Sequence, residues 1–174
     1  EKYEMTNLHY TILDLNRFRN KTVLVSGGGN GAIDWAVELL YVAKEVIVIY
    51  RKEQLTAHES QVEKLKEHGV QIMLNAEIQS VVSNEEKTAI AQVVINQGQE
   101  MTTLQVDDVL ISHGYNRDIS LTFAADIEPE RKDDYYLISQ GQCKTSVPGI
   151  FGAGDIIAYD DKVNLLVGTF QDAI

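Results

Sequence analysis

The stretch VLVSGGGNGAIDWAVELL, residues 23–40, decides the fold of this chain. It begins with a short apolar run that ends at Ser26, and three consecutive glycines follow. After the glycines, apolar residues recur at the three- and four-residue spacing of one helix face. The stretch therefore predicts a strand over 22–25, a tight turn and a helix over roughly 30–42.

The alternation of strand and helix continues beyond this stretch. Residues 45–50, EVIVIY, form a nearly continuous apolar run rich in β-branched side chains, which is typical of a strand buried on both faces. A second helix is predicted over 60–67, with Gly69 as its stop, and a third strand over 70–74. The order up to this point is β-α-β-α-β.

The pattern then changes to short strands joined by polar turns. Strands predicted over 78–82, 90–96 and 102–106 form an antiparallel meander, because turn-forming residues separate them. A buried strand returns at 108–112. Periodicity is lost over 136–148, where we expect a boundary, and a further strand is expected to start at 150–151.

The glycine turn has the spacing that a bound dinucleotide requires. Gly27, Gly29 and Ala32 fit G-x-G-x-x-A between a strand and a helix. The first glycine permits the turn, the second leaves room for a diphosphate near the backbone, and the small third residue lets the helix pack on the strand. The N–H groups that open the helix then face the anion, and Asn30 is expected to cap the helix.

The candidate binding residues of this turn are Gly27, Gly28, Gly29, Asn30, Gly31 and Ala32. A glycine-rich turn that holds no ligand is the alternative interpretation. With its strand and helix, the turn predicts an α/β fold: a Rossmann-like three-layer dinucleotide-binding domain that also carries the antiparallel β-meander.

Two cations follow the second strand, where the ribose of the nucleotide is usually recognised. An acidic residue there would favour NAD or FAD, whereas Arg51 and Lys52 favour the 2′-phosphate of NADP. Glu53 comes too late to replace the expected acid. His58 is a further candidate for the phosphate or adenine, although a surface histidine is the simpler interpretation.

Composition excludes several classes of function. The chain has 174 residues and a net charge of −11, which argues against general nucleic-acid binding and adhesion to anionic membranes. No apolar run approaches the roughly 20 residues that span a bilayer. The single cysteine, Cys143, excludes an internal disulfide and favours a reducing cytoplasm.

No catalytic or metal-binding group stands out from the sequence. The four histidines lack metal-ligand spacing, and no nucleophile lies beside a base. The sequence therefore predicts no catalytic residue and no metal-binding residue. Adjacent acidic pairs such as Asp107-Asp108 are interpreted as solvated turns, because neighbours on a strand point to opposite faces.

A second motif, IFGAGD over 150–155, is the other candidate site for a cofactor. Small residues at a strand end let a cofactor lie across it, and the Asp155 carboxylate can accept hydrogen bonds from sugar hydroxyls. Taken with GGGNGA and YRK, this motif resembles flavoproteins with two dinucleotide-binding domains, of the thioredoxin reductase type. The resemblance implies an entering segment or hinge at 1–15, an NADPH-binding domain at 16–138 and a return segment of the FAD-binding domain at 139–174.

The resemblance also implies cofactor contacts. Gly154 and Asp155 would bind the ribityl or pyrophosphate part of FAD, and the helix start around Gly168 and Thr169 would face the flavin. The chain departs from thioredoxin reductases in two respects, since it lacks a CxxC pair and has Thr56 and Ala57 where a third arginine tends to follow the basic pair.

The segments YRKEQLTAHES, SHGYNRD and KVNLLVGTFQDA look closer to the thioredoxin-reductase-like ferredoxin–NADP reductases. That family passes electrons from NADPH through FAD to ferredoxin or flavodoxin without a redox disulfide. In this comparison His113 and Gly114 lie at a strand end near the dinucleotide, and a structural role for His113 is equally open. A homodimeric parent protein is one option.

The chain is expected to be a piece of a longer protein, because it begins at Glu1 and ends inside an apolar helical pattern. It contains no second glycine turn for FAD. We therefore expect it to bind NADP(H), to hold FAD poorly and to be inactive alone. Two alternatives stay open: part of a disulfide or peroxide reductase with cysteines elsewhere, or a non-catalytic NADP-sensing module.

Overall fold

The chain folds into two compact units, residues 1–114 and 115–174, in a computed structural model that describes residue 3 and residues 6–114, 121–162 and 166–173. The sequence placed its boundary near 138. Tyr136–Ile138 (β10) pairs in parallel with Ile157–Ala158 (β11), so this strand belongs with the second compact unit, and the division between an NADPH-binding and an FAD-binding part stays a prediction.

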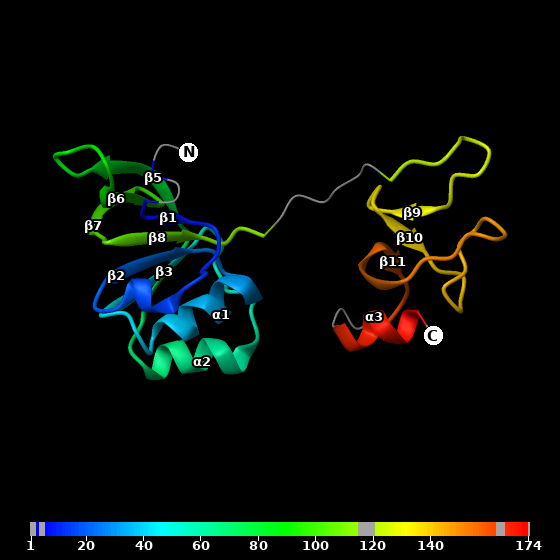
Figure 1. Cartoon of the computed structure of the whole chain (residues 1–174), viewed down its shortest axis with the longest axis horizontal. Helices are drawn as coiled ribbons and strands as arrows, with labels where there is room; N and C mark the ends of the chain where they lie inside the picture. Colours follow the sequence, from blue (N-terminus) through cyan, green and yellow to red (C-terminus); the bar gives the residue numbers. More distant parts are fainter. Residues whose placement is uncertain (1–2, 4–5, 115–120, 163–165, 174) are drawn as a thin grey trace. The chain divides into compact units, whose positions relative to one another are not determined.

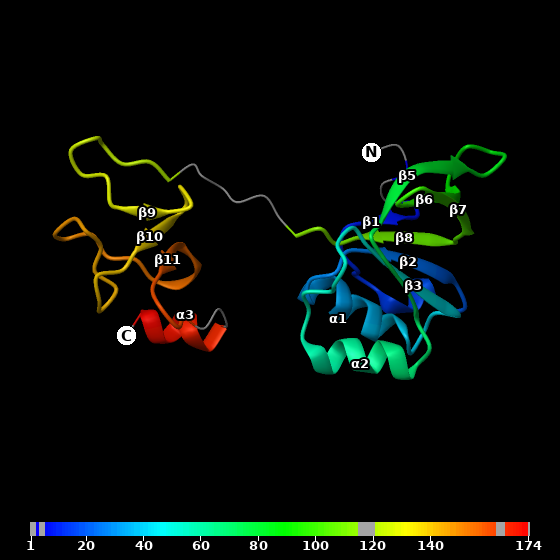
Figure 2. The same ribbon diagram turned by 180° about the vertical axis from the view of Figure 1, so that it is seen from behind.

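The first unit is built on a five-stranded parallel sheet (Figures 1 and 2). The strand order is β1-β8-β2-β3-β4. The bounds are Leu8–His9 for β1, Thr22–Ser26 for β2, Glu45–Tyr50 for β3, Gln71–Leu74 for β4 and Asp108–Ile111 for β8. The strands expected at 22–25, 45–50, 70–74 and 108–112 are therefore confirmed within a residue or two.

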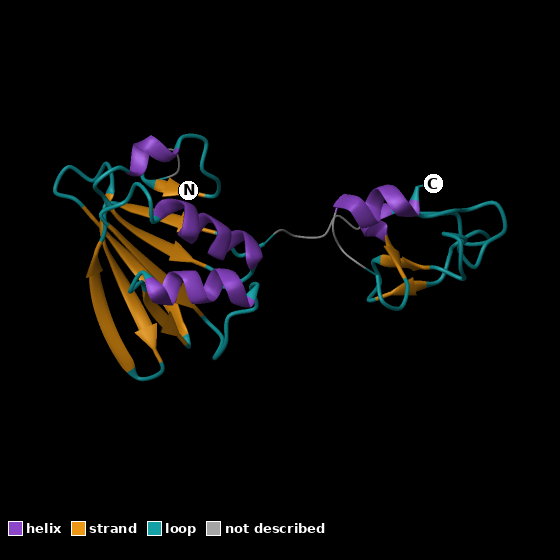
Figure 3. Ribbon diagram, turned by 90° about the horizontal axis from the view of Figure 1, so that it is seen from below, coloured by secondary structure: helices purple, strands orange, loops and turns teal. Residues whose placement is uncertain are grey.

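Helices cover one face of this sheet (Figure 3). They are Asn30–Leu39 (α1) and Glu59–Glu67 (α2). The side chains of Ile33 and Leu65 pack with Val23 and Val25 in one core cluster. Helix α1 ends about three residues before the predicted end at 42, because the next residues turn back toward the sheet through the bond from the Val42 N–H to the Leu39 carbonyl (3.1 Å).

An antiparallel meander covers the opposite face. Its strands are Ala76–Ser83 (β5), Ile90–Gln97 (β6) and Glu100–Gln105 (β7). Leu24 of β2 and Ile47 of β3 point to this side, where they pack with Val93 of β6. Because side chains alternate along a strand, β2 and β3 bury residues on both faces and join three layers. The predicted three-layer architecture is confirmed.

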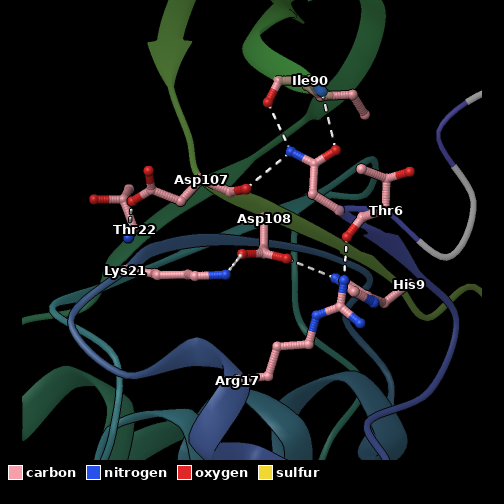
Figure 4. A network of polar contacts seen from close by, with 9 residues as sticks. Thr6, His9, Arg17, Lys21, Thr22, Ile90, Asp107 and Asp108 are labelled. Atoms are coloured by element: carbon pink, nitrogen blue, oxygen red, sulfur yellow. Dashed lines mark hydrogen bonds and ion pairs between the residues drawn. The ribbon is translucent and has the colours of Figure 1, made fainter. Parts of the chain in front are cut away.

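The segment before β2 is part of the first unit, although the sequence treated 1–15 as an entering segment or hinge. Residues 8–9 form the edge strand β1, and Leu15–Phe18 form a 3₁₀ helix that leads toward β2. The Asn7 amide donates to the carbonyls of Ile90 (2.7 Å) and Asp107 (2.8 Å), so this segment is bonded to the meander and to the start of β8 (Figure 4).

Asp108 is a buried carboxylate, which corrects its interpretation as a solvated turn. Its side chain is inaccessible to solvent and lies 2.6 Å from His9 Nε2 and 2.8 Å from Lys21 Nζ (Figure 4). Its neighbour Asp107 is exposed, as expected, and accepts the Thr22 N–H. A carboxylate can stay buried at this position because a lysine and a histidine bind its two oxygens.

In its described residues, 121–162 and 166–173, the second unit contains only short elements. Arg131–Lys132 (β9) pairs antiparallel with β10, and the 3₁₀ helix Gly154–Ile156 leads into β11. The strand expected at 150–151 is wrong, since Phe151 forms an isolated bridge with Lys144. Helix α3 spans Leu166–Asp172, so Gly168 and Thr169 lie within it rather than at its start.

Candidate nucleotide-binding site

The carboxyl ends of the parallel strands meet at one edge of the first unit's sheet. Ser26 ends β2, and His113 follows β8 at a distance of 87 residues along the chain. Ser26 Oγ and His113 Nε2 are 2.8 Å apart. The structure therefore brings His113 beside the glycine turn. In open α/β sheets this edge is where ligands bind.

Two glycines of the turn are required by packing within the protein. Gly27 has a φ of +150°, and a Cβ there would lie 2.2 Å from the Ser112 carbonyl oxygen. A Cβ on Gly28 would lie 2.4 Å from the ring of Tyr50. Ala32 is buried, and its Cβ would lie 2.8 Å from a Cβ on Gly27, which is a second reason why Gly27 has no room for a side chain. Strand β8, strand β3 and helix α1 all approach this turn closely.

Gly29 and Gly31 have no such internal requirement. The nearest atom to a Cβ on Gly29 would be Thr56 Oγ1 at 3.9 Å, and on Gly31 it would be Ser112 Oγ at 3.6 Å. Both are ordinary contacts. Gly29 is also the N-cap of α1, and it has no side chain to accept the N–H groups of the first helical turn. The open space and the available donors fit an anionic group that approaches the backbone.

Asn30 does not cap helix α1, contrary to the expectation. Its Oδ1 accepts the backbone N–H of His58 at 2.9 Å, so it bonds to the residue that begins α2. The Asn30 side chain can reach the His58 N–H because the loop after β3 is bonded to the glycine turn, through the Thr56 N–H and the Gly28 carbonyl. His58 therefore contacts the turn through its backbone N–H, and the residue as a whole is exposed to solvent.

Arg51 and Lys52 follow β3 directly and are exposed. The pKa of His113 is lowered, first by burial and second by the positive charge of Arg51. Arg51 is thus close enough to the turn's edge of the sheet to act on His113 electrostatically. Gly114 has a φ of +87° and ends the first unit, while the rest of the SHGYNRD motif, residues 115–118, lies outside the described residues.

The second motif forms a separate cluster within the second unit. Gly154 has a φ of +74°, and a Cβ there would lie 2.9 Å from Thr169 Cγ2, so the 3₁₀ helix and α3 are in close contact. Gly154 is buried, whereas Asp155 is exposed. The structure brings Gly154 and Thr169 together and leaves the Asp155 carboxylate facing solvent.

Asp172, which no sequence motif indicates, organises this cluster. Its carboxylate accepts the Tyr159 hydroxyl (2.6 Å), the Gly154 N–H (3.2 Å) and a close bond from Lys162 Nζ. The pKa of Asp172 is lowered, chiefly by the hydrogen bond from Lys162 and then by the one from Tyr159. Cys143 Sγ donates to the Asp172 backbone carbonyl at 3.1 Å. These partners are 10 to 29 residues away, so no sequence spacing indicates them.

No other site class appears in the described part of the chain. Among the described residues, no group of three or more histidine, cysteine, aspartate or glutamate side chains is placed to hold a metal ion. No described helix is both long and apolar enough to cross a bilayer.

A parallel sheet whose carboxyl edge carries a glycine turn before a helix defines a dinucleotide-binding α/β domain. The chain belongs to the pyridine nucleotide-disulphide oxidoreductase family, whose model matches residues 4–173. The resemblance to flavoproteins of this kind, expected from the motifs, is confirmed.

Curated relatives carry a more specific name. The chain is 51% identical to "Ferredoxin--NADP reductase 3" of Lysinibacillus sphaericus and 45% identical to "Ferredoxin--NADP reductase 1" of Bacillus licheniformis. In both cases the match covers 99% of this chain and 50% of the relative. The chain thus spans about half the length of the curated relatives it matches.

Solved structures share the fold. The thioredoxin reductase of T. acidophilum superposes with a TM-score of 0.81 at 22% identity, covering 98% of this chain and 55% of that one. The thioredoxin reductase of Lactococcus lactis gives a TM-score of 0.77 at 23% identity, with the same coverage of both chains. At this level of identity the likeness concerns the fold alone.

Proposed function

We propose that this chain supplies the NADPH-binding part of a flavin-dependent oxidoreductase that passes electrons from NADPH through FAD to ferredoxin or flavodoxin. The observation that carries the proposal is the edge of the parallel sheet, where the open backbone at Gly29 and the cations Arg51 and Lys52 lie on adjacent strand ends. The names of the curated relatives support the electron acceptor.

In this proposal the turn residues 27–32 hold the diphosphate through backbone N–H groups, and Arg51 and Lys52 hold the 2′-phosphate. His58, His113 and Gly114 border the same site. When bound, NADPH supplies a hydride and FAD accepts it, which is chemistry of the cofactors rather than of side chains. Accordingly, no residue of the chain is assigned as a catalytic acid, base or nucleophile.

Gly154, Asp155 and Thr169 form the proposed contact with FAD in the parent protein. Gly154 packs closely on Thr169, and its lack of a side chain allows this contact between the turn and α3. The exposed Asp155 carboxylate is free to accept hydroxyl groups of the cofactor. We propose the units 1–114 and 115–174 as the NADPH-binding part and the FAD-side part, in place of a division at 138.

Two other functions share this fold. A disulfide or peroxide reductase would need redox cysteines outside this chain, because Cys143 is its only cysteine. A non-catalytic NADP-sensing module would bind the nucleotide without any flavin partner. The relatives' names favour the reductase of ferredoxin. A cytoplasmic setting and a homodimeric parent stay predictions.

The test is calorimetric titration of the chain with NADPH and with NADH. We expect NADPH to bind more tightly, and the Arg51→Ala variant to lose about 1–3 kcal/mol of NADPH binding with little change for NADH, because a charge-assisted hydrogen bond to the 2′-phosphate is removed. Lys66→Ala is the matched control, since it removes one positive charge from the last turn of α2. Equal affinity of the unmodified chain for both nucleotides would contradict the proposal.

A further inference from the structure

The loop that carries Arg51 and Lys52 is bonded to the glycine turn. The carbonyl of Gly28 accepts two hydrogen bonds from Thr56, one from the backbone N–H at 2.8 Å and one from Oγ1 at 3.3 Å. Two residues further on, the His58 N–H donates to Asn30 Oδ1 at 2.9 Å. Residues 51–58 therefore form a loop whose far end is held by the turn itself.

The near end of the loop is held elsewhere. The Lys52 carbonyl accepts the N–H of Asn75, the residue between β4 and β5, at 3.0 Å. The Tyr50 ring, at the end of β3, lies so close to Gly28 that a Cβ there would be 2.4 Å from the ring. The backbone around the two cations is thus fixed on both sides.

The side chains of Arg51 and Lys52, unlike their backbone, are not held by hydrogen bonds or ion pairs with other described residues. Among the described residues, neither Arg51 nor Lys52 forms an ion pair or a side-chain hydrogen bond with another described residue, and both are exposed. Their position relative to the turn is consequently set by the loop backbone. The bonds that hold this backbone to the turn come from Thr56 and Asn30.

We infer that Asn30 and Thr56 are positioning residues that set the preference for a nucleotide with a 2′-phosphate over one without it. This inference rests on the proposed function and adds a specificity mechanism to the same site. The side-chain bonds of Asn30 and Thr56, together with the backbone bond from the Thr56 N–H to the Gly28 carbonyl, fix the separation between the diphosphate subsite on the turn and the 2′-phosphate subsite on the loop. A nucleotide that carries both groups gains from this fixed separation, whereas one without the 2′-phosphate does not.

Thr56 has a role in this arrangement that the cations of the YRK motif do not provide. Here it contributes no charge and instead bonds the loop to Gly28. The Thr56 side chain therefore serves to hold the loop at a defined place rather than to supply charge for the 2′-phosphate.

The experiment measures dissociation constants of NADPH and NADH by calorimetry for four variants of this chain. Asn30→Ala removes the acceptor of the His58 N–H, and Thr56→Val removes the hydroxyl at nearly constant volume. Thr56→Ser keeps the hydroxyl and should restore the preference. Asn84→Ala is the matched control, because Asn84 Oδ1 likewise accepts a backbone N–H, that of Thr88 at 2.9 Å, in the turn between β5 and β6.

The readout is the ratio of the two dissociation constants. Both nucleotides carry the diphosphate, so any direct contact of Asn30 with that group cancels in the ratio. We expect the preference for NADPH to fall by about three- to tenfold in Asn30→Ala, which corresponds to one hydrogen bond, and by less in Thr56→Val, whose bond is longer. Thr56→Ser and Asn84→Ala should keep the preference of the unmodified chain.

Amide hydrogen exchange of the free chain gives a second readout that needs no nucleotide. The His58 amide proton should exchange faster in Asn30→Ala than in the unmodified chain. Unchanged exchange, or faster exchange with an unchanged ratio, would overturn the inference and leave the proposed function intact. If the unmodified chain binds both nucleotides equally, the proposed function fails and the inference fails with it.

Discussion

The two units of the molecule are stabilised in different ways. The first contains two apolar clusters, one on each face of its parallel sheet, and most residues of the parallel strands contribute to one or the other. In the described part of the second unit, Leu137 and Ile157 are the buried hydrophobic residues. Its order depends on polar contacts, above all those of Asp172.

The contrast indicates where a binding site can be rigid without a ligand. A turn between buried strands is fixed by the packing on both faces of the sheet, so the first unit can present its backbone N–H groups in a constant geometry. A turn held by a few polar bonds near the surface opens at lower cost in free energy. We therefore expect the glycine turn to be preformed and the turn at Gly154 to be the more easily opened of the two.

The largest effect expected from this comparison is at Asp108, the buried carboxylate of the first unit. Asp108→Ala leaves Lys21 and His9 without their shared partner, and we expect the free energy of unfolding of the first unit to fall by about 3 kcal/mol, the lower end for a broken buried pair because Lys21 is partly exposed. Urea unfolding followed by the fluorescence of Trp35, the single tryptophan, measures this loss.

Asp107→Ala is the control for this experiment. Asp107 is exposed and accepts one backbone N–H, from Thr22. Its removal should shift the urea midpoint much less than Asp108→Ala does. Equal shifts of the urea midpoint for the two variants would contradict the prediction, because they would mean that the buried Asp108 contributes no more to stability than the exposed Asp107.

The sequence was informative where long apolar runs dominate. EVIVIY predicted β3 at its observed bounds, because a strand buried on both faces needs apolar residues at every position. The sequence was uninformative for β1 and for β9 to β11, which are two or three residues long and show no periodicity. Their pairing depends on contacts between distant segments.

The site shows the same division. The glycine turn and the two cations follow directly from their place beside strands, and the structure brings them to one edge. Asn30 and Asp108 were misinterpreted, because their partners, His58 and His9, are 28 and 99 residues away along the chain. A side chain's partner across the fold is set by topology, which local spacing does not encode.

A smaller effect is expected at Asp172, in the second unit. Its folded pKa is lowered below the ordinary value of 3.8, so its contribution to stability is complete above about pH 4 and is lost as the pH falls through the lowered pKa. The Gly154 amide resonance should follow this titration, because that N–H donates to the Asp172 carboxylate. Nuclear magnetic resonance between pH 6 and pH 2, values chosen to bracket about 4, records it.

Asp172→Asn serves as the matched variant, since the amide has nearly the same shape and does not titrate. In that variant the Gly154 resonance should lose its acid titration, while unfolding of the first unit, followed at Trp35, should be unchanged. A shift in the Trp35 transition would contradict the separate stabilisation of the two units.

The smallest effect is expected at His113, at the edge of the first unit's sheet. Its folded pKa is lowered from 6.5, first by burial and then by Arg51, so the unfolded chain binds more protons just below pH 6.5. The His113 contribution is therefore complete above that pH and declines as the pH falls toward the folded pKa. Arg51→Ala should raise the folded pKa only in part, because burial, the larger cause, stays. Titration of the His113 ring protons by nuclear magnetic resonance measures both values, and no change in Arg51→Ala would mean that Arg51 points away from the turn.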